Sequence, residues 1–409
     1  MSSEWEETTL GGILTLQRGM DLPVQDRKRG KFPVVASTGV VGFHNEAPVK
    51  GPGVVIGRSG SIGGGQYIES DFWPLNTTLW VKDFKGNHPR YCYYLLRSID
   101  FSGLNAGSGV PTLNRNHLHP MPMSNPPLEE QEQIARLLGS LDDHITLLRE
   151  TNATLEAIAQ ALFKSWFVDF DPVRAKMEGR APEGMDEATA AVFPDGLEES
   201  ALGLVPRGWV AAPIYDMATF INGAAYKAFE PNAERRGRPI IKIAELKSGV
   251  TAQTAYSDVA MPGKYLIETG DILFSWSGNP DTSIDTFVWT FEPAWLNQHI
   301  FRVLPRVNQE RTFVLQVLRY LKPLFTELAR NKQTTGLGHV TVADMKRELI
   351  AMPTAELLRQ FDLSVGPLHA RIFENQRQSQ TLATLRDTLM PRLISGQLKL
   401  SEVRAEHEH

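Results

Sequence analysis

Two stretches of the chain repeat apolar residues at alternating steps of four and three. In residues 126–167 nine of the ten positions at these steps are apolar, and in residues 353–394 three polar residues interrupt the same pattern. A spacing of about 3.5 residues keeps one face of a helix turned toward a partner helix, as in a coiled coil. The predicted seam consists of Leu141, Ile145, Leu148, Asn152, Leu155, Leu162, Leu368, Ile372, Asn375, Ser379, Leu382 and Leu389.

Polar and helix-breaking residues mark both predicted helices. Asn152 in one seam, and Asn375 with Ser379 in the other, are expected to fix the register at some cost in stability. Gly366-Pro367 is expected to break the second helix near its start, and Gly139 to break the first more weakly, because proline clashes inside a helix. About 28 residues of helix, or about 42 Å, would follow each break.

The two helical stretches align with each other without a gap. Ile145 corresponds to Ile372, so the offset is 372 − 145 = 227 residues, and Gly139 then meets Gly366. The pattern predicts a tandem duplication in which each copy is a mixed block followed by a helix. We expect the two helices to run antiparallel and to separate the blocks, although helices packed into separate domain cores would give the same pattern.

Short apolar runs between turn residues predict strands in both blocks. The predicted strand regions are residues 32–37, 53–65, 77–83, 238–246, 270–278 and 298–305. In each copy one strand leads into a small polar loop, Arg58-Ser59-Gly60-Ser61 or Ser275-Trp276-Ser277-Gly278. Glycine lets a backbone approach phosphate closely, and Ser and Arg supply donors to it. A hairpin turn without a ligand explains such a loop equally well.

The composition is that of ordinary globular protein. The 409 residues are 42% apolar and 22% charged, and no apolar run approaches the roughly 18 residues of a membrane span. The acidic start MSSEWEETTL lacks the features of a signal peptide, so we expect a cytoplasmic protein without a membrane partner. The single cysteine, Cys92, cannot form an intramolecular disulfide or a cysteine zinc site, and no metal site is expected.

The net charge of −5 is distributed unevenly. Residues 1–125 hold 12 Lys and Arg against 10 Asp and Glu, and residues 209–352 hold 16 against 14, so each block carries +2. Residues 126–208 hold 7 against 16. The acidic middle therefore masks any electropositive face of the two blocks, but an excess of this size does not by itself indicate DNA binding.

Four runs of the chain are characteristic. The central run SWFVDFDPVRAKMEGRAPEGM (165–185) is the most specific of them, and AAVFPDGLEESALGLVPRGW (190–209), GDILFSWSG (270–278) and LMPRLISGQL (389–398) agree with it. Together they resemble the specificity subunit of type I restriction-modification systems. The likeness covers essentially the whole chain. It implies two target-recognition domains, each reading half of a split site on double-stranded DNA, and two helices in an antiparallel coiled coil that sets the spacing.

The resemblance also implies partners and domain bounds. Two methyltransferase subunits would dock on the helices, restriction and translocase subunits would complete the complex, and these partners would use S-adenosylmethionine, ATP and Mg, while this chain binds no cofactor and is not catalytic. The expected fold is α+β and pseudo-two-fold symmetric. Its segments are target-recognition domain 1 (1–125), the central spacer helix region (126–168), a linker (169–208), target-recognition domain 2 (209–352), the C-terminal spacer helix region (353–398) and a tail (399–409).

Polar and basic loop residues are the candidate DNA contacts. Arg suits guanine and Asn or Gln suits adenine, but the same side chains also bind phosphate. The candidates are Arg58, Ser59, Asn76, Thr77, Arg115, Asn116, Ser275, Ser277, Asn279, Asn297, Gln298, Lys332, Gln333 and Thr334. Two basic clusters are expected to contact phosphate or only water, and they are Arg27-Lys28-Arg29 and Arg235-Arg236-Arg238.

The stretch Asn125-Pro126-Pro127 leaves two other functions open. It resembles part of the catalytic loop of amino-methyltransferases, so the chain could be a self-contained adenine DNA methyltransferase, but position 128 is leucine where such an enzyme needs an aromatic residue. The other alternative is a coiled-coil scaffold without a DNA role. At the offset of 227 the partner residues are Met352-Pro353-Thr354, so the stretch is better interpreted as a hinge where a recognition domain becomes a helix.

Overall fold

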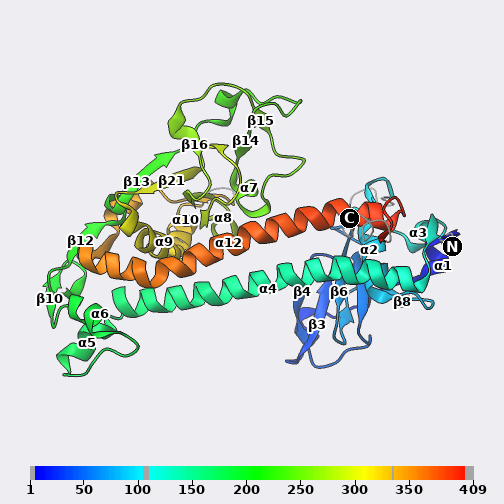
Figure 1. Ribbon diagram of the computed structural model, residues 1–409, viewed down its shortest axis with the longest axis horizontal. Coiled ribbons are helices and arrows are strands. Elements are labelled where there is room, and N and C mark those ends of the chain that lie inside the picture. Colours follow the sequence, from blue (N-terminus) through cyan, green and yellow to red (C-terminus); the bar gives the residue numbers. More distant parts are fainter. Residues whose placement is uncertain (1–4, 105–109, 334–335, 401–409) are drawn as a thin grey trace, which may run out of the picture. The chain divides into compact units, whose positions relative to one another are not determined.

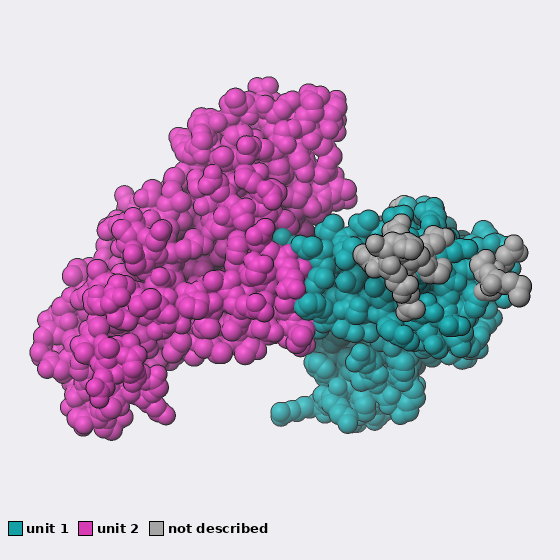
Figure 2. Space-filling view, in the orientation of Figure 1, with its two compact units in different colours: residues 1–146, 380–409 teal, residues 147–379 magenta. Residues whose placement is uncertain are grey.

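The computed structural model describes residues 5–104, 110–333 and 336–400 of the chain. It divides into two compact units, which Figure 2 colours separately: unit 1 takes residues 1–146 and 380–409, and unit 2 takes residues 147–379. Each unit combines a strand-rich block with parts of two long helices, α4 (Leu128–Phe167) and α12 (Ala355–Ile394), as Figure 1 shows. The predicted α+β class with two strand-rich blocks and two long helices is confirmed.

Unit 1 is built around an antiparallel sheet with the strand order β2-β8-β5-β6, beside a smaller sheet with the order β4-β3-β7 and the pair β1-β9. All five residues of β5 are buried, because its apolar run GVVIG lies inside the sheet and is covered on both faces. The bounds are β1 (Glu6–Thr9), α1 (Leu10–Ile13), β2 (Thr15–Arg18), β3 (Phe32–Ala36), β4 (Gly39–His44), β5 (Gly53–Gly57), β6 (Gly63–Ile68), β7 (Trp73–Pro74), β8 (Thr78–Asp83), α2 (Pro89–Ser98), α3 (Arg115–Leu118) and β9 (Pro122–Asn125).

Helix α2 covers the main sheet of unit 1. It begins with Pro89 at its first position and with the His88 side chain accepting from the Tyr91 amide, a favourable start for a short helix. Its apolar face buries Tyr91 and Tyr94 among residues of β5, β8 and the first turns of α4. This packing fixes the strand-rich block of unit 1 to the long helix.

Unit 2 contains two four-stranded sheets, ordered β13-β21-β17-β19 and β15-β14-β20-β16, and the pairs β10-β11, β12-β23 and β18-β22. The bounds are α5 (Asp171–Met177), α6 (Glu187–Val192), β10 (Leu197–Ser200), β11 (Gly203–Pro206), β12 (Val210–Pro213), β13 (Ala218–Asn222), β14 (Arg238–Ile241), α7 (Ile243–Ser248), β15 (Tyr256–Ser257), β16 (Leu266–Ile267), β17 (Ile272–Ser275), β18 (Ser277–Gly278), α8 (Pro280–Ser283), β19 (Asp285–Val288), β20 (Ala294–Leu296), β21 (Ile300–Pro305), α9 (Arg311–Tyr320), α10 (Lys322–Asn331), β22 (Gly338–His339), α11 (Val342–Arg347) and β23 (Leu349–Met352).

One strand prediction in unit 2 is wrong in its second half. The run 238–246 was expected to be extended, but β14 ends at Ile241 and α7 begins at Ile243. The carboxylate of Glu245, which is buried, accepts the backbone N–H of Lys242 at 3.0 Å and so caps the helix. This local cap overrides the strand preference of the isoleucines.

The main sheets of the two units repeat the same plan. In both, the first strand in the chain pairs with the last, and the second strand lies between the last and the third, as the orders β2-β8-β5-β6 and β13-β21-β17-β19 show. A helix follows the last strand of each sheet, α2 after β8 and α9 after β21. The predicted tandem duplication is therefore confirmed in the topology.

The long helices are continuous, so the predicted breaks are wrong. α12 passes through Gly366-Pro367 and α4 passes through Gly139 without interruption. A proline inside a helix costs about 3 kcal/mol, part of which is a clash with the residue before it. Glycine at position 366 has no Cβ to clash, and burial of the neighbouring Phe361 and Val365 offsets the remaining cost.

Within each unit the two long helices run antiparallel. In unit 2, Asn152 of α4 contacts Asn375 of α12, and Phe163 contacts Phe361, so higher numbers on one helix meet lower numbers on the other. In unit 1, Asp142 of α4 is bound by Arg386 of α12. Residues 169–208, expected to be a linker, form α5, α6 and the hairpin β10-β11, and Phe193 packs edge-on against Trp166 of α4.

Candidate nucleic-acid interface

The loop after β5 is held rigidly by backbone hydrogen bonds. The N–H groups of Arg58 and Ser59 both donate to the Thr77 carbonyl, at 2.8 and 3.1 Å, and the Arg58 carbonyl accepts from the Leu113 amide at 2.8 Å. Gly60 has a positive φ of 83°, which turns the chain at little steric cost. The loop therefore presents the Arg58 side chain from a fixed backbone.

A depression of about 870 Å³ lies beside this loop. Arg58 reaches it from the loop, Arg18 from the end of β2 and Arg115 from α3, while Asp21 supplies a carboxylate on the same wall. The amide of Asn76 donates to that carboxylate. Among the described residues none of the three arginines forms an ion pair, and three guanidinium groups against the one carboxylate of Asp21 give the depression a net positive charge that would attract an anion.

The predicted residues of unit 1 gather around this depression to different degrees. Arg58 and Arg115 line it, and Asn76 is tied to its wall by the bond to Asp21 and by its carbonyl, which accepts from the Arg58 guanidinium at 3.2 Å. The Thr77 hydroxyl accepts from the Ser37 amide at 3.3 Å. Ser59 and Asn116 flank these residues in the chain. Arg18 was not predicted, because an arginine that ends a strand carries no local signal of its position in space.

The corresponding loop of unit 2 has the same backbone bonds. The N–H of Trp276 donates to the His299 carbonyl at 3.4 Å, and the Trp276 carbonyl accepts from the Val340 amide at 2.8 Å. Ser277 and Gly278 then pair with His339 and Gly338 in β18-β22. In unit 1, Ser59 pairs with Thr112 and the Gly60 amide donates to the Pro111 carbonyl.

Trp276 therefore occupies in unit 2 the position that Arg58 occupies in unit 1. The indole N–H of Trp276 donates to the Asn222 side-chain oxygen at 3.1 Å, and its ring packs at 5.8 Å from the rings of both His299 and Phe301. Asn222 corresponds to Arg18 in the same way. The amide of the next residue, Gly223 or Gly19, donates to the carbonyl of Ile300 in unit 2 or of Thr78 in unit 1. A basic face in unit 1 thus corresponds to an aromatic and amide face in unit 2.

Two predicted contacts of unit 2 are buried, which is a correction to their expected role. Ser275 is 0% exposed and Asn297 is 3% exposed, so neither side chain can meet a DNA surface in this structure. Ser275 is the last residue of β17, where side chains alternate between the two faces of the sheet, and its hydroxyl turns inward. The residue that follows it, Trp276, is the one that the loop presents.

Lys332 also has a different role from the predicted one. Its ammonium group donates to both oxygens of Asp344, one at 2.7 Å, and Asp344 is 1% exposed. Burial alone would raise the pKa of Asp344, but hydrogen bonds from Lys332 and Thr341 outweigh it and lower the pKa to about 2. Lys332 therefore neutralises a buried carboxylate, which leaves it a poor candidate for contacting a base.

The remaining predicted residues of unit 2 lie at or near the surface. Asn279 is exposed and its side-chain oxygen caps α8, where it accepts from the amides of Asp281 and Thr282. The Gln298 amide lies 3.3 Å from the His299 ring nitrogen. Ser277 is half-buried in β18 and Gln333 is exposed. Thr334 lies outside the described residues.

The two basic clusters differ in how far they are engaged. Arg235 packs 4.5 Å from the Tyr256 ring centre, Arg236 forms an ion pair with Asp258, and Arg238 lies 5.8 Å from the Trp295 ring centre. In the first cluster Lys28 and Arg29 are exposed, while the Arg27 guanidinium donates to the Val41 carbonyl at 3.1 Å. The second cluster is therefore largely a structural feature of its own unit.

None of the predicted seam residues is exposed. Buried seam positions are Ile145, Leu148, Ile372 and Asn375, and half-buried ones are Leu141, Asn152, Leu155, Leu162, Leu368, Ser379, Leu382 and Leu389. The two asparagines meet, with the Asn375 amide donating to Asn152 Oδ1 at 2.9 Å. The Asn152 amide donates to the Ile372 carbonyl at 3.3 Å.

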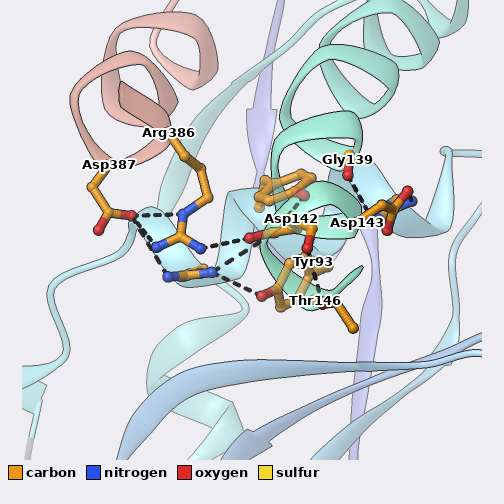
Figure 3. A network of polar contacts seen from close by, with 10 residues as sticks. Tyr93, Gly139, Asp142, Asp143, Thr146, Arg386 and Asp387 are labelled. Atoms are coloured by element: carbon orange, nitrogen blue, oxygen red, sulfur yellow. Dashed lines mark hydrogen bonds and ion pairs between the residues drawn. The ribbon is translucent and has the colours of Figure 1, made fainter. Parts of the chain in front are cut away.

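A polar network fixes α2 of unit 1 to both long helices (Figure 3). Asp142 of α4 accepts from the Tyr94 hydroxyl at 2.6 Å and forms ion pairs with Arg386 of α12 and Arg97 of α2. Arg97 and Arg386 also pair with Asp387. The network therefore joins three helices through carboxylates and guanidinium groups that complement each other in charge.

Unit 2 has its own version of this connection. Gln316 of α9 donates to the His369 ring nitrogen of α12 at 2.8 Å and to Glu156 of α4 at 3.3 Å. Arg319 of α9 forms an ion pair with the same glutamate. Arg319 follows Gln316 by three residues, as Arg97 follows Tyr94, so both units dock their helix on the long helices through equivalent positions.

Two further properties limit the chemistry of the described residues. No group of three or more His, Cys, Asp and Glu side chains in this part of the chain is placed to hold a metal ion. Within the same residues no helix combines the length and the apolar character needed to cross a membrane. Cys92 is buried in unit 1, and burial raises the pKa of its thiol to about 12, so it is not activated as a nucleophile.

Comparisons with known proteins agree with one another. The chain is similar to the type I restriction enzyme MjaIX specificity subunit of Methanocaldococcus jannaschii, with 26% identity over 324 residues that cover 76% of this chain and 70% of that protein. It is similar to the HindI specificity subunit of Haemophilus influenzae, with 26% identity over 393 residues, or 82% and 84% of the two chains. The S subunit of the type I restriction-modification system of M. genitalium shares the fold, with a TM-score of 0.54, 16% identity and coverage of 95% and 96%.

The family model described as "Type I restriction modification DNA specificity domain" matches residues 2–157 and again residues 206–360. Two copies of one domain in tandem agree with the repeated sheet topology described above. The chain therefore belongs to the type I restriction modification DNA specificity domain family and is the non-catalytic DNA sequence-specificity component of such a system.

Proposed function

We propose that the chain reads an asymmetric, bipartite site on double-stranded DNA, one half with each unit. The observation that carries the proposal is the pair of matched loops that present different side chains, Arg58 in one unit and Trp276 in the other. Equivalent backbone positions would approach the two half-sites in the same way. Because the side chains at these positions differ in charge and shape, the two half-sites differ in sequence.

The arginine-lined depression supports DNA as the ligand of unit 1. Arg18, Arg58 and Arg115 come from three separate elements and line one depression, in which they outnumber the single carboxylate, that of Asp21. Arginines are the usual partners of phosphate and of guanine edges. Asn76, Thr77, Ser59 and Asn116 surround these arginines and are the proposed auxiliary contacts, and Ser277, Asn279, Gln298 and Gln333 are those of unit 2.

The proposal assigns six functional segments to the chain. They keep the bounds expected from the sequence, with target-recognition domains at 1–125 and 209–352, spacer helix regions at 126–168 and 353–398, a linker at 169–208 and a tail at 399–409. Binding would take place in the cytoplasm.

The long helices are the proposed docking surface for two methyltransferase subunits. Leu147 and Ile158 of α4 are 59% and 44% exposed, and Leu363 of α12 is 60% exposed. The docked subunits would cover these apolar side chains. Restriction and translocase subunits would join in the complete complex, and S-adenosylmethionine, ATP and Mg would be bound by these partners.

The methyltransferase alternative is not favoured, and the structure gives Asn125-Pro126-Pro127 a structural role. The Asn125 amide donates to Asn87 at 3.0 Å, and the buried Gln131 side chain donates to Asn87 and to the Pro126 carbonyl. The Pro127 carbonyl accepts the amides of Glu130 and Gln131 at 3.0 Å. These bonds cap the start of α4, so the stretch anchors the helix to the block before it.

The test is methylome sequencing of a host without other DNA methylation that expresses this chain with its methyltransferase subunits. The expected result is methylation at one bipartite motif with two unlike halves and a fixed nonspecific spacer. The methyltransferase subunits expressed without this chain are the control and should give no motif. A continuous or palindromic motif, or a motif that persists without this chain, would contradict the proposal.

A further inference from the structure

The matched loops carry an inference about which base each unit selects, and it rests on the function proposed above. We propose that Arg58 selects a guanine in the half-site of unit 1, and that Trp276, at the equivalent position, selects a thymine in the half-site of unit 2. The chemistry differs between the two units because their side chains offer different groups from the same backbone position.

The backbone equivalence is the first step. Thr77 in unit 1 and His299 in unit 2 accept the amide of the loop residue, and Leu113 and Val340 donate to its carbonyl. Each loop residue is thus held on both sides by strands or loops of its own unit. A side chain presented from such a fixed backbone loses little conformational entropy on binding, which suits it to reading a base edge.

Arg58 has donors available for a base. One guanidinium nitrogen donates to the Asn76 carbonyl at 3.2 Å, which orients the planar group. A guanidinium has five N–H donors in a fixed fork, and the fork matches the O6 and N7 acceptors of guanine. Arg18 and Arg115 flank it on the same depression and are placed to hold the adjoining phosphates.

Trp276 has no hydrogen-bonding group left for a base. The indole N–H is the single donor of the side chain, and it is directed to Asn222 Oδ1 at 3.1 Å. The ring is half-buried and packs against Phe301, so an apolar surface remains for the ligand. In the major groove the apolar group of a base is the thymine methyl.

The experiment uses the complete methyltransferase complex and methylome sequencing of Arg58→Ala and Trp276→Ala. Arg58→Ala should relax one G·C position in one half-site, and Trp276→Ala should relax one A·T position in the other, each by about 5-fold to 100-fold in discrimination. Lys82→Ala is the matched control, because Lys82 is exposed toward the far end of β8 from the loop and should leave the motif unchanged.

Two more variants keep the inference testable if an alanine variant does not fold. Arg58→Gln should change the preferred base from guanine to adenine, because a carboxamide matches the N6 and N7 edge of adenine. Trp276→Phe should keep thymine, because an apolar ring remains. Gel filtration and thermal unfolding of each complex verify that it is assembled and folded.

Three results would overturn the inference. Lower methylation of the same motif by all four variants would place Arg58 and Trp276 on the DNA backbone. Relaxation of both halves by one variant would contradict the assignment of one residue to each unit, and relaxation at a base pair of the wrong type would contradict the chemistry. The wild-type complex is sequenced first. If it gave no bipartite motif, the proposed function itself would be contradicted, and this result is distinct from the three above.

Discussion

The side-chain amide of Asn375 donates to Asn152 Oδ1 at 2.9 Å, across the seam between α12 and α4 in unit 2. Asn375 is 0% exposed, and its own side-chain oxygen has no partner among the described residues. A polar pair in an otherwise apolar seam costs stability and favours the one register in which its members meet. The energetic role of the pair is therefore specificity of helix pairing.

The first prediction concerns this pair. Asn375→Leu alone should lower the free energy of unfolding by about 1–3 kcal/mol, because Asn152 loses its donor. Asn152→Leu with Asn375→Leu should recover that loss or exceed it, since the seam becomes apolar. Urea unfolding of the four members of the double-mutant cycle measures the coupling, and a double variant as unstable as the sum of the single ones would contradict the prediction.

The second prediction compares two adjacent carboxylates. Asp142 is 18% exposed and binds Tyr94 and Arg386, whereas Asp143 is 62% exposed and pairs with Arg90. Asp142→Asn should cost about 1.5–3 kcal/mol of unfolding free energy, because it removes one of the two carboxylates that pair with the buried Arg386. Asp143→Asn should cost less than about 1 kcal/mol. Equal losses of unfolding free energy in the two variants, measured by thermal or urea unfolding, would show that the network around Asp142 stabilises the fold no more than an exposed ion pair does.

The third prediction is a pH dependence centred on His369. Burial lowers the pKa of His369 to about 4, with Arg319 contributing in the same direction, and Gln316 donates to the ring nitrogen, so the neutral imidazole is the bound form. Because the unfolded chain binds a proton near pH 6.5 and the folded chain does not, unfolding free energy should fall as pH decreases from about 6.5 to about 4, by at most about 3 kcal/mol.

His369→Gln tests this dependence, because it removes the titrating group and keeps a side chain that can accept from Gln316. The urea midpoint of this variant should vary less with pH between 4.5 and 7 than that of the wild type. The difference should correspond to roughly the change in unfolding free energy given above. His144→Gln is the control, since His144 is exposed on α4. An unchanged pH profile in His369→Gln would rule out His369 as its source.

The fourth prediction concerns Arg18, which we assign to phosphate. Arg18→Ala should weaken DNA binding uniformly across sequences and reduce the slope of log K against log salt by about 1. Arg58→Ala should change base selectivity as well. Fluorescence anisotropy with cognate and mismatched duplexes at several salt concentrations separates the two effects, and selective loss on cognate DNA in Arg18→Ala would reassign Arg18 to a base.

The fifth prediction concerns spacing. Four residues inserted after Thr146 in α4 and four after Gln380 in α12 add one seam step to each helix, or about 6 Å. The nonspecific spacer of the methylated motif should widen while both half-sites stay the same. Insertion into α4 alone is the control and should abolish methylation, because it shifts the register of the asparagine pair. An unaltered spacer would show that the length of the two helices does not set the spacer of the motif.

The seam could be predicted from the sequence because its signal is local and periodic. The site was harder, since the two blocks are not related by one offset. The matched backbone bonds relate Gly19 to Gly223 (204 residues), Arg58 to Trp276 (218), Thr77 to His299 (222) and Leu113 to Val340 (227). Insertions between strands change the offset, so only the topology aligns Arg58 with Trp276.

The errors in the predicted site have the same physical origin. Ser275 precedes the presented residue by one position, and one step along a strand moves a side chain to the opposite face. Lys332 pairs with Asp344, twelve residues away, through a fold that the local sequence does not indicate. Composition and spacing therefore predict the loop but not the direction of each side chain on it.

Gly139 has no side chain, and the Arg90 guanidinium occupies the space beside it on the surface of α4. A Cβ at position 139 would lie 2.8 Å from the Arg90 guanidinium carbon, and the same guanidinium donates to the Gly139 carbonyl at 3.2 Å. A side chain at position 139 would displace the Arg90 guanidinium and break its bond to the residue 139 carbonyl, and a short residue at position 90 would leave this space empty. A target-recognition domain transferred from another protein onto α4 would therefore need a residue at position 90 that fits the residue at position 139.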